Sequence, residues 1–482
     1  MNFLLFFRRS TVICLPLLAA CAQTALPPDH PAETLGLPDS FRTSGSAERR
    51  IRWWRNFDDP VMDRLIQLAL RDSPDLQAIL WRLEQAEAAA RGARSGFWPR
   101  LTGRLDNTEQ RFSSDDFEDS DSEGNSWGGS LAASYEVDLW GRVRAGARAA
   151  EASRLAQAES LQTAALTLAA EVADTWLQLL EQWGQRDLLR RQLETNRKTL
   201  RVLELRFGGG TSSAADVLQQ RQLIQQSEQE LQAAEADIET LRVQLAALLG
   251  TSAERLPDFV RPDSVMPSLP ALPDTGVPGQ LLLRRPDVKR AQRELLQGYY
   301  LADQAWAERL PAISLSAVAS GGGTAIADIL DGWLLALTAA GEGIIFDGGQ
   351  LVSAQAQQQA VVQERWALYR NVVVQALSEV EQALIREQAV LDRLHHLRER
   401  ERLAGLIAER QLRAYSRGAV DFLNVLTATN DQQSLARQIL TARRELIENR
   451  VTLYRALSGG LPAEDLPVAE PMELELYRTE KD

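Results

Sequence analysis

The side chains that could do chemistry in this 482-residue chain gather at two interruptions of long helix-like segments. Asp216 follows a run of three glycines, and Asp421 follows a short break that contains Arg417. In a symmetric assembly, acids that face inward at such turns form carboxylate rings, which favour cations and can gate by pairing with basic neighbours. Both acids are also consistent with a second interpretation, in which they are helix N-caps or first-turn acids stabilised by the helix dipole.

Other residue patterns give little support to catalysis or metal binding. The histidines are His30 and the adjacent pair His395 and His396, and neighbouring helical residues point about 100° apart, which makes a poor chelate. We find no catalytic constellation and expect no enzyme and no cofactor. The net charge of −13 also argues against a nucleic-acid partner, which requires a basic surface.

The N-terminus has the pattern of a lipoprotein signal. Residues 1–20 carry two arginines, an apolar stretch and small residues, and Cys21 follows Leu-Ala-Ala, which resembles the bacterial lipobox. A plain signal peptide with a chance cysteine is the alternative. Lipidation of Cys21, palmitate included, would anchor the chain, and Ala22 in place of Asp favours the outer membrane. Residues 21–50, rich in Pro, Ser and Thr, then predict an extended tether.

Very long helices must position the candidate residues. Residues 348–457 contain no proline and repeat apolar residues at heptad spacing, which indicates a coiled-coil-like packing face. The spacing predicts helices over about 349–415 and 419–457, and the first would be roughly 100 Å long. The earlier part of the chain predicts a matching pair over about 142–206, with one interruption at Gly184, and 213–249.

Two strand pairs precede these helices, over about 101–112 and 127–140 and over about 312–320 and 333–346. In the second strand, an apolar face that includes Leu131 and Tyr135 alternates with a small polar face that ends in Glu136 and Asp138. This alternation is typical of a membrane barrel strand with lipid outside and water inside, and also of a soluble sheet packed on a core.

The chain is an internal repeat, because Pro286 and Pro311 recur at the separation of Pro74 and Pro99. Residues 51–250 and 280–460 each read as a short helix, a β-hairpin and two very long antiparallel helices. Residues 251–279 form a proline-rich connector, and 461–482 form a C-terminal tail. The fold class is therefore mainly α with a membrane β part. Four strands cannot close a membrane barrel, so the chain must oligomerise, and three copies give a 12-stranded barrel continuous with 12 helical rods.

This architecture resembles the TolC family of outer-membrane efflux channels, in particular its lipoprotein (NodT-type) branch. The resemblance covers almost the whole mature chain. It is carried by Trp53-Trp54-x-x-Phe57-x-Asp59-Pro60, Tyr135–Arg142, Arg284-Arg285-Pro286-Asp287, Phe346-Asp347-Gly348-Gly349 and Gly418–Leu426.

The resemblance implies a passive homotrimeric duct that spans the outer membrane and extends into the periplasm. Its partners would be a periplasmic adaptor (membrane fusion) protein and an inner-membrane transporter of the RND type. The candidate tip gate comprises Asp216, Arg417, Asp421, Asn424 and Thr427, and the candidate adaptor-docking turns contain Gly208, Gly209, Gly210 and Gly418. Many relatives carry an Asp where this chain has Thr427, so the sequence departs from the family pattern there.

Two other functions compete with the channel. A periplasmic adaptor lipoprotein also combines a lipobox with a helical hairpin, but it has one hairpin flanked by β-rich domains. A coiled-coil scaffold without a channel needs no lipid-facing strand, and the alternation around Leu131 and Tyr135 argues against it.

Overall fold

The computed structural model describes residues 36–46, 51–112, 122–261 and 265–469. The predicted signal peptide, Cys21, His30 and most of the acidic loop before Ser126 lie outside these residues. The chain divides into two compact units. Unit 1 holds the described parts of Glu84–Gln157 and Ala291–Arg370, and unit 2 holds those of Ala32–Leu83, Ala158–Arg290 and Asn371–Asp482.

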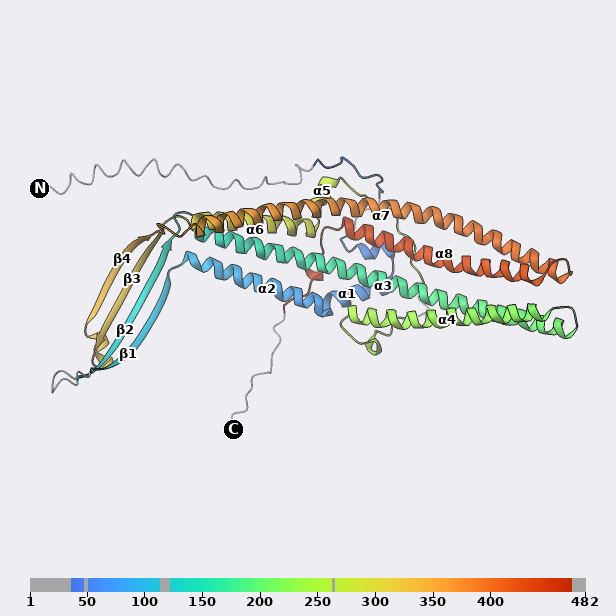
Figure 1. Cartoon of the computed structure of the whole chain (residues 1–482), viewed down its shortest axis with the longest axis horizontal. Coiled ribbons are helices and arrows are strands. Elements are labelled where there is room, and N and C mark those ends of the chain that lie inside the picture. Colours follow the sequence, from blue (N-terminus) through green and yellow to red (C-terminus); the bar gives the residue numbers. More distant parts are fainter. Residues whose placement is uncertain (1–35, 47–50, 113–121, 262–264, 470–482) are drawn as a thin grey trace, which may run out of the picture. The chain divides into compact units, whose positions relative to one another are not determined.

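The elements follow one another in the order shown in Figure 1. They are the 3-10 helix η3 (Trp53–Phe57), α1 (Pro60–Asp72), α2 (Pro74–Arg94), η4 (Ser95–Phe97), β1 (Arg100–Phe112), β2 (Ser122–Val137), α3 (Arg142–Gly208), α4 (Ala214–Leu248), η5 (Ala253–Arg255), α5 (Pro278–Leu282), α6 (Pro286–Ala307), β3 (Ala312–Gly323), η6 (Ile326–Leu330), β4 (Trp333–Glu342), α7 (Gln350–Ser416), α8 (Phe422–Leu457) and η7 (Ala463–Asp465).

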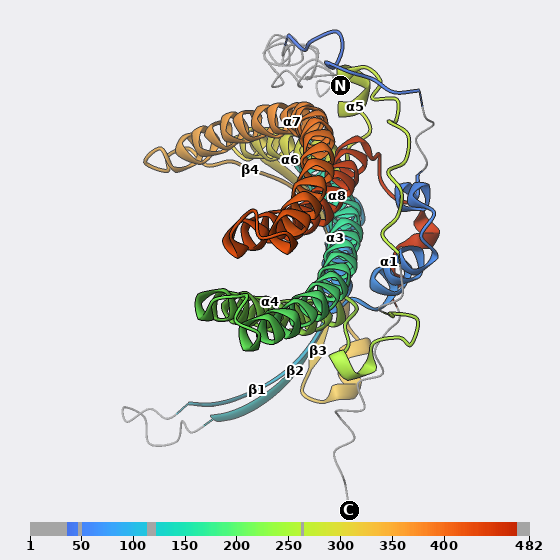
Figure 2. The same ribbon diagram turned by 90° about the vertical axis from the view of Figure 1, so that its right-hand side faces the viewer.

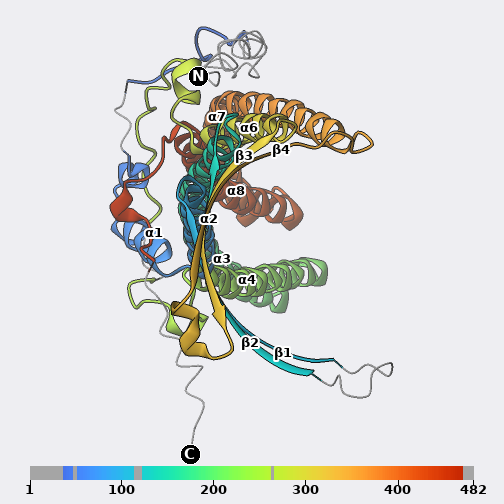
Figure 3. The same cartoon turned by 90° about the vertical axis from the view of Figure 1, so that its left-hand side faces the viewer.

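Unit 1 contains one antiparallel sheet in the order β1-β2-β3-β4. Figure 3 shows the molecule from the side on which these strands lie in Figure 1. The register aligns Leu101, Ala133, Ala317 and Leu337 in one row across all four strands. The adjacent row, on the opposite face, is Arg100, Ser134, Ser316 and Thr338. Leu101 and Leu337 are 65% and 77% exposed, so the apolar face is open in the single chain. The alternation predicted for β2 therefore extends across these rows of the sheet, although the second face also carries Val318, Ala336 and Leu334.

Both predicted strands that lead into long helices end earlier than expected. β2 ends at Val137 instead of residue 140, and β4 ends at Glu342 instead of residue 346. Asp138 accepts hydrogen bonds from the backbone N–H groups of Val143 and Arg144 at 3.0 Å, and Asp347 accepts one from that of Leu351 at 2.8 Å. These carboxylates thus cap the following helices and take no part in the strands.

The connection between β3 and β4 folds back onto the apolar face of the sheet. A Cβ atom built on Gly321 would lie 2.0 Å from the Ile329 carbonyl oxygen, and one on Gly323 would lie 2.2 Å from the Asp328 Cβ. Only glycine permits this approach of η6 to the strand, because any side chain would overlap the loop.

Unit 2 is built around two helical hairpins, in which the part of α3 from Ala158 pairs with α4 and the part of α7 from Asn371 pairs with α8. α3 and α7 each contain 67 residues. The predicted interruption at Gly184 is wrong, since α3 continues through it and a Cβ there would meet Leu440 at an ordinary 3.6 Å. The predicted seam position Leu391 is 37% exposed, and Val390 and Leu397 are buried instead.

Buried polar contacts join the long helices, both between the hairpins and within one of them. Asn196 of α3 and Gln433 of α8 exchange side-chain hydrogen bonds of 3.4 and 3.1 Å, and both side chains are buried. Farther along α8, Arg450 forms a two-pronged ion pair with Glu387 of α7 at 2.6 and 2.8 Å, with both residues below 10% exposed. Such contacts specify which helix faces meet, because a slip would leave buried polar groups unpaired.

The segment from η3 to α1 packs on α3 through its aromatic residues. Trp53, Trp54 and Phe57 are buried in one cluster with Trp176. Asp59 binds both helices: one carboxylate oxygen caps α1 through Val61 and Met62, and the other accepts the Trp176 indole N–H at 2.8 Å. The motif from Trp53-Trp54 to Asp59-Pro60 therefore holds α1 against α3.

Parts of the predicted tether and tail are packed in unit 2. Phe41, within the expected tether 21–50, is 6% exposed and contacts Leu281 and Val380 in one apolar cluster. Within the expected tail 461–482, Leu461 is buried in the main core, and Asp465 accepts a hydrogen bond from the Arg52 guanidinium at 2.7 Å. The extended tether and the tail are therefore each shorter than predicted, because the residues nearest the folded core are packed against it.

Candidate functional site

The two turns that carry the predicted site residues lie at the same end of their hairpins in unit 2, at the right of Figure 1. Figure 2 looks at that end and shows the hairpins as neighbours. Gly210 and Gly418 end the first helix of each hairpin with φ of +71° and +73°. This left-handed conformation is the usual helix stop and favours glycine.

Asp216 lies in the first turn of α4, as the third helical residue of a capping box whose N-cap is Ser213. Its backbone N–H donates to the Ser213 hydroxyl at 3.1 Å, and its carboxylate accepts the Ser213 N–H at 3.0 Å. Burial opposes ionisation of Asp216, but the hydrogen bonds from Ser213 and Ser212 and the charge of Arg206 outweigh it and lower its pKa. Asp216 therefore carries a fixed negative charge. The helix-capping role expected as one of its two readings is present in the structure.

Asp216 is also connected to the other hairpin. The Ser212 hydroxyl donates to the Asp216 carboxylate at 2.8 Å and lies 3.2 Å from the Tyr415 hydroxyl of α7. Since the Ser212 proton is used on the carboxylate, the Tyr415 hydroxyl donates to Ser212. The result is a hydrogen-bonded chain from Tyr415 through Ser212 to a carboxylate, in which each bond polarises the next.

A cation and an apolar cluster complete this connection. The guanidinium of Arg206 lies 4.5 Å from the centre of the Tyr415 ring, within the range of a cation–π interaction. The ring of Phe422 packs edge-on against Tyr415 at 5.4 Å, and both belong to a buried cluster with Leu203 and Val217. We call the group of Arg206, Ser212, Asp216 and Tyr415 the turn lock.

The remaining predicted gate residues lie outside the turn lock. Arg417, Asp421, Asn424 and Thr427 are all exposed. Asp421 is the N-cap of α8 by position, but its side chain makes no capping hydrogen bond, and Thr427 donates to the Leu423 carbonyl at 3.0 Å. In the described part of the chain, no ion pair involves the charged side chains of Arg417 or Asp421, so their expected pairing does not occur within one copy.

Arg206, Ser212 and Tyr415 are the site residues that sequence reasoning missed. Tyr415 is the last residue of the predicted helix over 349–415, immediately before the predicted break, and Ser212 lies in the run after the glycines. An aromatic side chain at the end of a helix, beside a turn, was the one available signal. Of the predicted turn glycines, Gly208 and Gly209 are also exposed, and Gly208 has open space around its Cα.

No metal or membrane-spanning helix emerges from the described residues. His395 and His396 are exposed, their ring centres lie 5.6 Å apart, and in the described ranges no cluster of three metal-ligating side chains forms. Over the same ranges, every helix is too short or too polar to cross a membrane.

Comparison with known proteins identifies the relatives of this chain. The family description "Outer membrane efflux protein" matches residues 65–251 and 277–459. The pyoverdine export outer membrane protein OpmQ of Pseudomonas putida is 32% identical over 459 residues, which are 93% of this chain and 96% of that protein. The toluene efflux pump outer membrane protein TtgF of Pseudomonas putida is 30% identical over 434 residues, covering 87% and 88%. The solved outer-membrane channel OprN superposes with a TM-score of 0.83 at 25% identity, covering 91% and 98%.

Proposed function

The chain belongs to the outer membrane efflux protein family, and from this premise we propose that three copies form a passive duct across the outer membrane and the periplasm. The protein is the outer-membrane channel component of an efflux system. It uses no energy of its own, since the driving force comes from an inner-membrane transporter.

The observation that carries the proposal is the continuous apolar face of the β1-β2-β3-β4 sheet. Its rows, such as Leu101–Ala133–Ala317–Leu337, alternate with rows such as Arg100–Ser134–Ser316–Thr338. A sheet with one exposed apolar face and a second face of mostly polar and small residues suits lipid on one side and water on the other. β1 and β4 are open edges, and pairing β1 of one copy with β4 of the next removes every edge.

Three copies would join 12 strands into one barrel and 12 helical rods into the tube below it. The TM-score of 0.83 to the channel OprN supports the channel fold of each copy. Lipidation of Cys21 would add an anchor in the same membrane. A periplasmic adaptor would dock at the turns with Gly208, Gly209, Gly210 and Gly418, and the transporter would be of the RND type.

The gate in this proposal has two parts. The turn lock holds the α3–α4 hairpin to the α7–α8 hairpin of the same copy through Tyr415, Ser212 and Asp216. The exposed acid Asp421 and the neighbouring Arg417 supply charges that three copies turn into rings around the pore. Opening would separate the hairpins, and the rings would set the preference for cations.

Purified full-length protein in planar bilayers tests the channel and the rings together. The wild type should migrate as an SDS-resistant, heat-modifiable trimer from outer-membrane fractions and conduct ions in discrete steps. An Asp421→Ala variant, alone or with Arg417→Ala, should raise single-channel conductance and lower cation preference while the trimer persists. A trimer-free, non-conducting protein would instead indicate the adaptor or scaffold function, and an unchanged conductance would remove Asp421 from the gate.

A further inference from the structure

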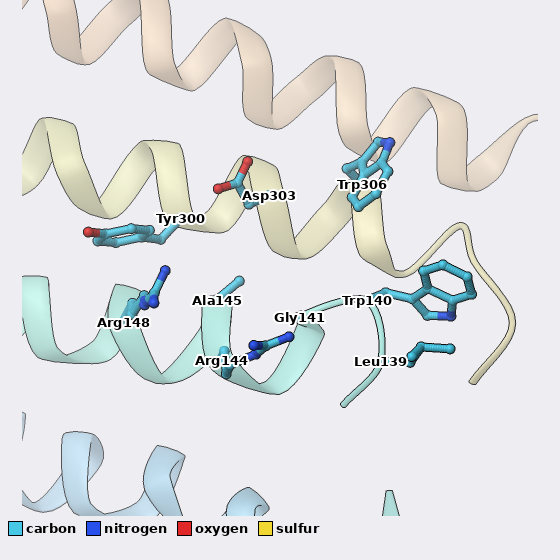
Figure 4. Close-up of a pocket in the computed structure, with 9 residues that line it drawn as sticks. All are labelled: Leu139, Trp140, Gly141, Arg144, Ala145, Arg148, Tyr300, Asp303 and Trp306. Atoms are coloured by element: carbon cyan, nitrogen blue, oxygen red, sulfur yellow. The ribbon is translucent and has the colours of Figure 1, made fainter. Parts of the chain in front are cut away.

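A cavity of about 250 Å³ lies in unit 1 between the start of α3 and the end of α6 (Figure 4). Neither the turn lock nor the sheet uses it. Its chemistry comes from two arginines, an acid and three aromatic side chains, namely Trp140, Arg144, Arg148, Tyr300, Asp303 and Trp306.

The charges in the cavity are incompletely paired. Arg144 is held by Asp138, which accepts from its Nε at 3.0 Å. Arg148, one helical turn farther, makes no hydrogen bond or ion pair with any described residue, and the same is true of Asp303 across the cavity. Burial raises the pKa of Asp303, and the positive charge of Arg148 opposes that rise. The two groups therefore interact electrostatically without forming an ion pair.

Opposite charges that face each other across a cavity fit a ligand that carries both signs. Two guanidinium groups at i and i+4 on one helix present several N–H donors to a phosphate, the anion that arginine recognises best. A carboxylate with free acceptor positions then suits an ammonium group. The acid argues against a purely anionic ligand, because it would repel one.

The depth of the cavity relative to the sheet indicates where such a ligand comes from. The apolar face ends at the row of Val137, Ile313 and Gly341, and Trp140 follows β2 by three residues. The Trp140 indole N–H donates to the Pro311 carbonyl at 2.7 Å, which fixes the ring beside the first residue of β3. Tryptophan and tyrosine just beyond an apolar band mark the level of lipid headgroups.

We infer that this cavity binds the headgroup of a phosphoethanolamine lipid, with its phosphate on Arg144 and Arg148 and its ammonium group at Asp303. The rings of Trp140 and Trp306 flank the glycerol end of the headgroup. The inference rests on the proposed function, because it requires the apolar face of the sheet to be in a membrane. The bound lipid would fix the height of the channel at the periplasmic surface of that membrane.

Native mass spectrometry of the full-length protein in nanodiscs tests the inference. The discs contain equal amounts of phosphatidylethanolamine and phosphatidylglycerol, which differ in the ammonium group. The wild type should retain phosphatidylethanolamine preferentially. Arg148→Ala should lower its retention about tenfold, the value of one charge-assisted hydrogen bond. Asp303→Asn should remove the preference, by lowering phosphatidylethanolamine retention and by raising that of anionic phosphatidylglycerol, which the carboxylate no longer repels.

Arg309→Ala is the matched control, because Arg309 lies at the same end of α6 and pairs with Gln355 outside the cavity. It should retain lipid like the wild type. Equal retention of both lipids by the wild type, or equal losses in Arg148→Ala and Arg309→Ala, would overturn the inference. So would saturable binding of soluble glycerophosphoethanolamine without lipid retention. Conductance of the same purified variants in planar bilayers separates the two proposals. Conducting trimers without a lipid preference would contradict only the headgroup site.

Discussion

Replacing Tyr415 by Phe is the sharpest test of the turn lock. The substitution removes the hydroxyl that lies 3.2 Å from Ser212 and keeps the ring that packs on Phe422 and beneath Arg206. The apolar cluster and the cation–π contact therefore persist, and the hydrogen-bonded chain to Asp216 is cut. We expect Tyr415→Phe to raise the open probability of the channel without loss of the trimer.

The magnitude follows from one hydrogen bond per copy. A hydrogen bond of this kind stabilises the state that contains it by about 1 kcal/mol net. Three copies that open together would lose about 3 kcal/mol, and since each 1.4 kcal/mol is a factor of ten, the closed state would be weakened about a hundredfold. Copies that open independently would each shift only about fivefold. The size of the effect thus reports whether the three locks act in concert.

Single-channel recording in planar bilayers measures this shift, with Tyr369→Phe as the matched control. Tyr369 is a buried tyrosine of the same helix, stacked on Trp366, and its hydroxyl has no hydrogen-bond partner among the described residues. The control should behave like the wild type. If Tyr415→Phe and Tyr369→Phe show the same open probability, the hydrogen-bonded chain does not hold the hairpins together and the reasoning fails.

Three further substitutions test the packing that supports the site. Gly321→Ala should destabilise the folded sheet by about 1–3 kcal/mol, because the added Cβ would overlap the Ile329 carbonyl. The temperature at which the trimer dissociates in SDS should fall accordingly, and an unchanged temperature would contradict the loop placement. Glu387→Ala should lower the free energy of unfolding, measured by circular dichroism, by roughly 3–5 kcal/mol, because it leaves Arg450 charged and buried without its carboxylate partner. A loss under about 1 kcal/mol would count against a stabilising role of the pair. Asp174→Asn should remove a pH dependence: burial raises the pKa of Asp174 to about 7, so its contribution to stability is complete below about pH 4 and is lost as the pH rises to about 7. Its unfolding midpoint should exceed that of the wild type more at pH 8 than at pH 5, and equal gains at both would refute the assignment.

Periodicity revealed the long helices and the two faces of the sheet because both are local properties of the chain. Leu131 and Ser130 point to opposite faces whatever their partners are, so alternation was sufficient to separate the apolar face from the polar one. The ends of elements were harder to locate. Asp138 continues the alternating pattern of its strand by residue type, and only its hydrogen bonds to the next helix show that the strand has already ended.

The turn lock escaped sequence reasoning for a different reason. Ser212 and Tyr415 are 203 residues apart, and nothing in either segment states which helix face will meet the other. Charge and position identified Asp216 and Asp421 as candidates, but they gave Arg417 as the partner. The structure instead connects Asp216 to an uncharged serine and an aromatic hydroxyl of the second hairpin.

The two readings of Asp216, helix cap and gate residue, are not alternatives. One oxygen of its carboxylate accepts both the Ser213 N–H and the Ser212 hydroxyl. The capping box fixes that oxygen relative to the backbone of the turn, and the fixed oxygen orients the Ser212 hydroxyl so that its lone pair faces Tyr415. A cap is therefore what makes the lock rigid. The same logic separates Asp421, whose carboxylate makes no capping bond and stays exposed. A charge held by a cap can join hairpins within one copy, whereas a free charge is available to the pore.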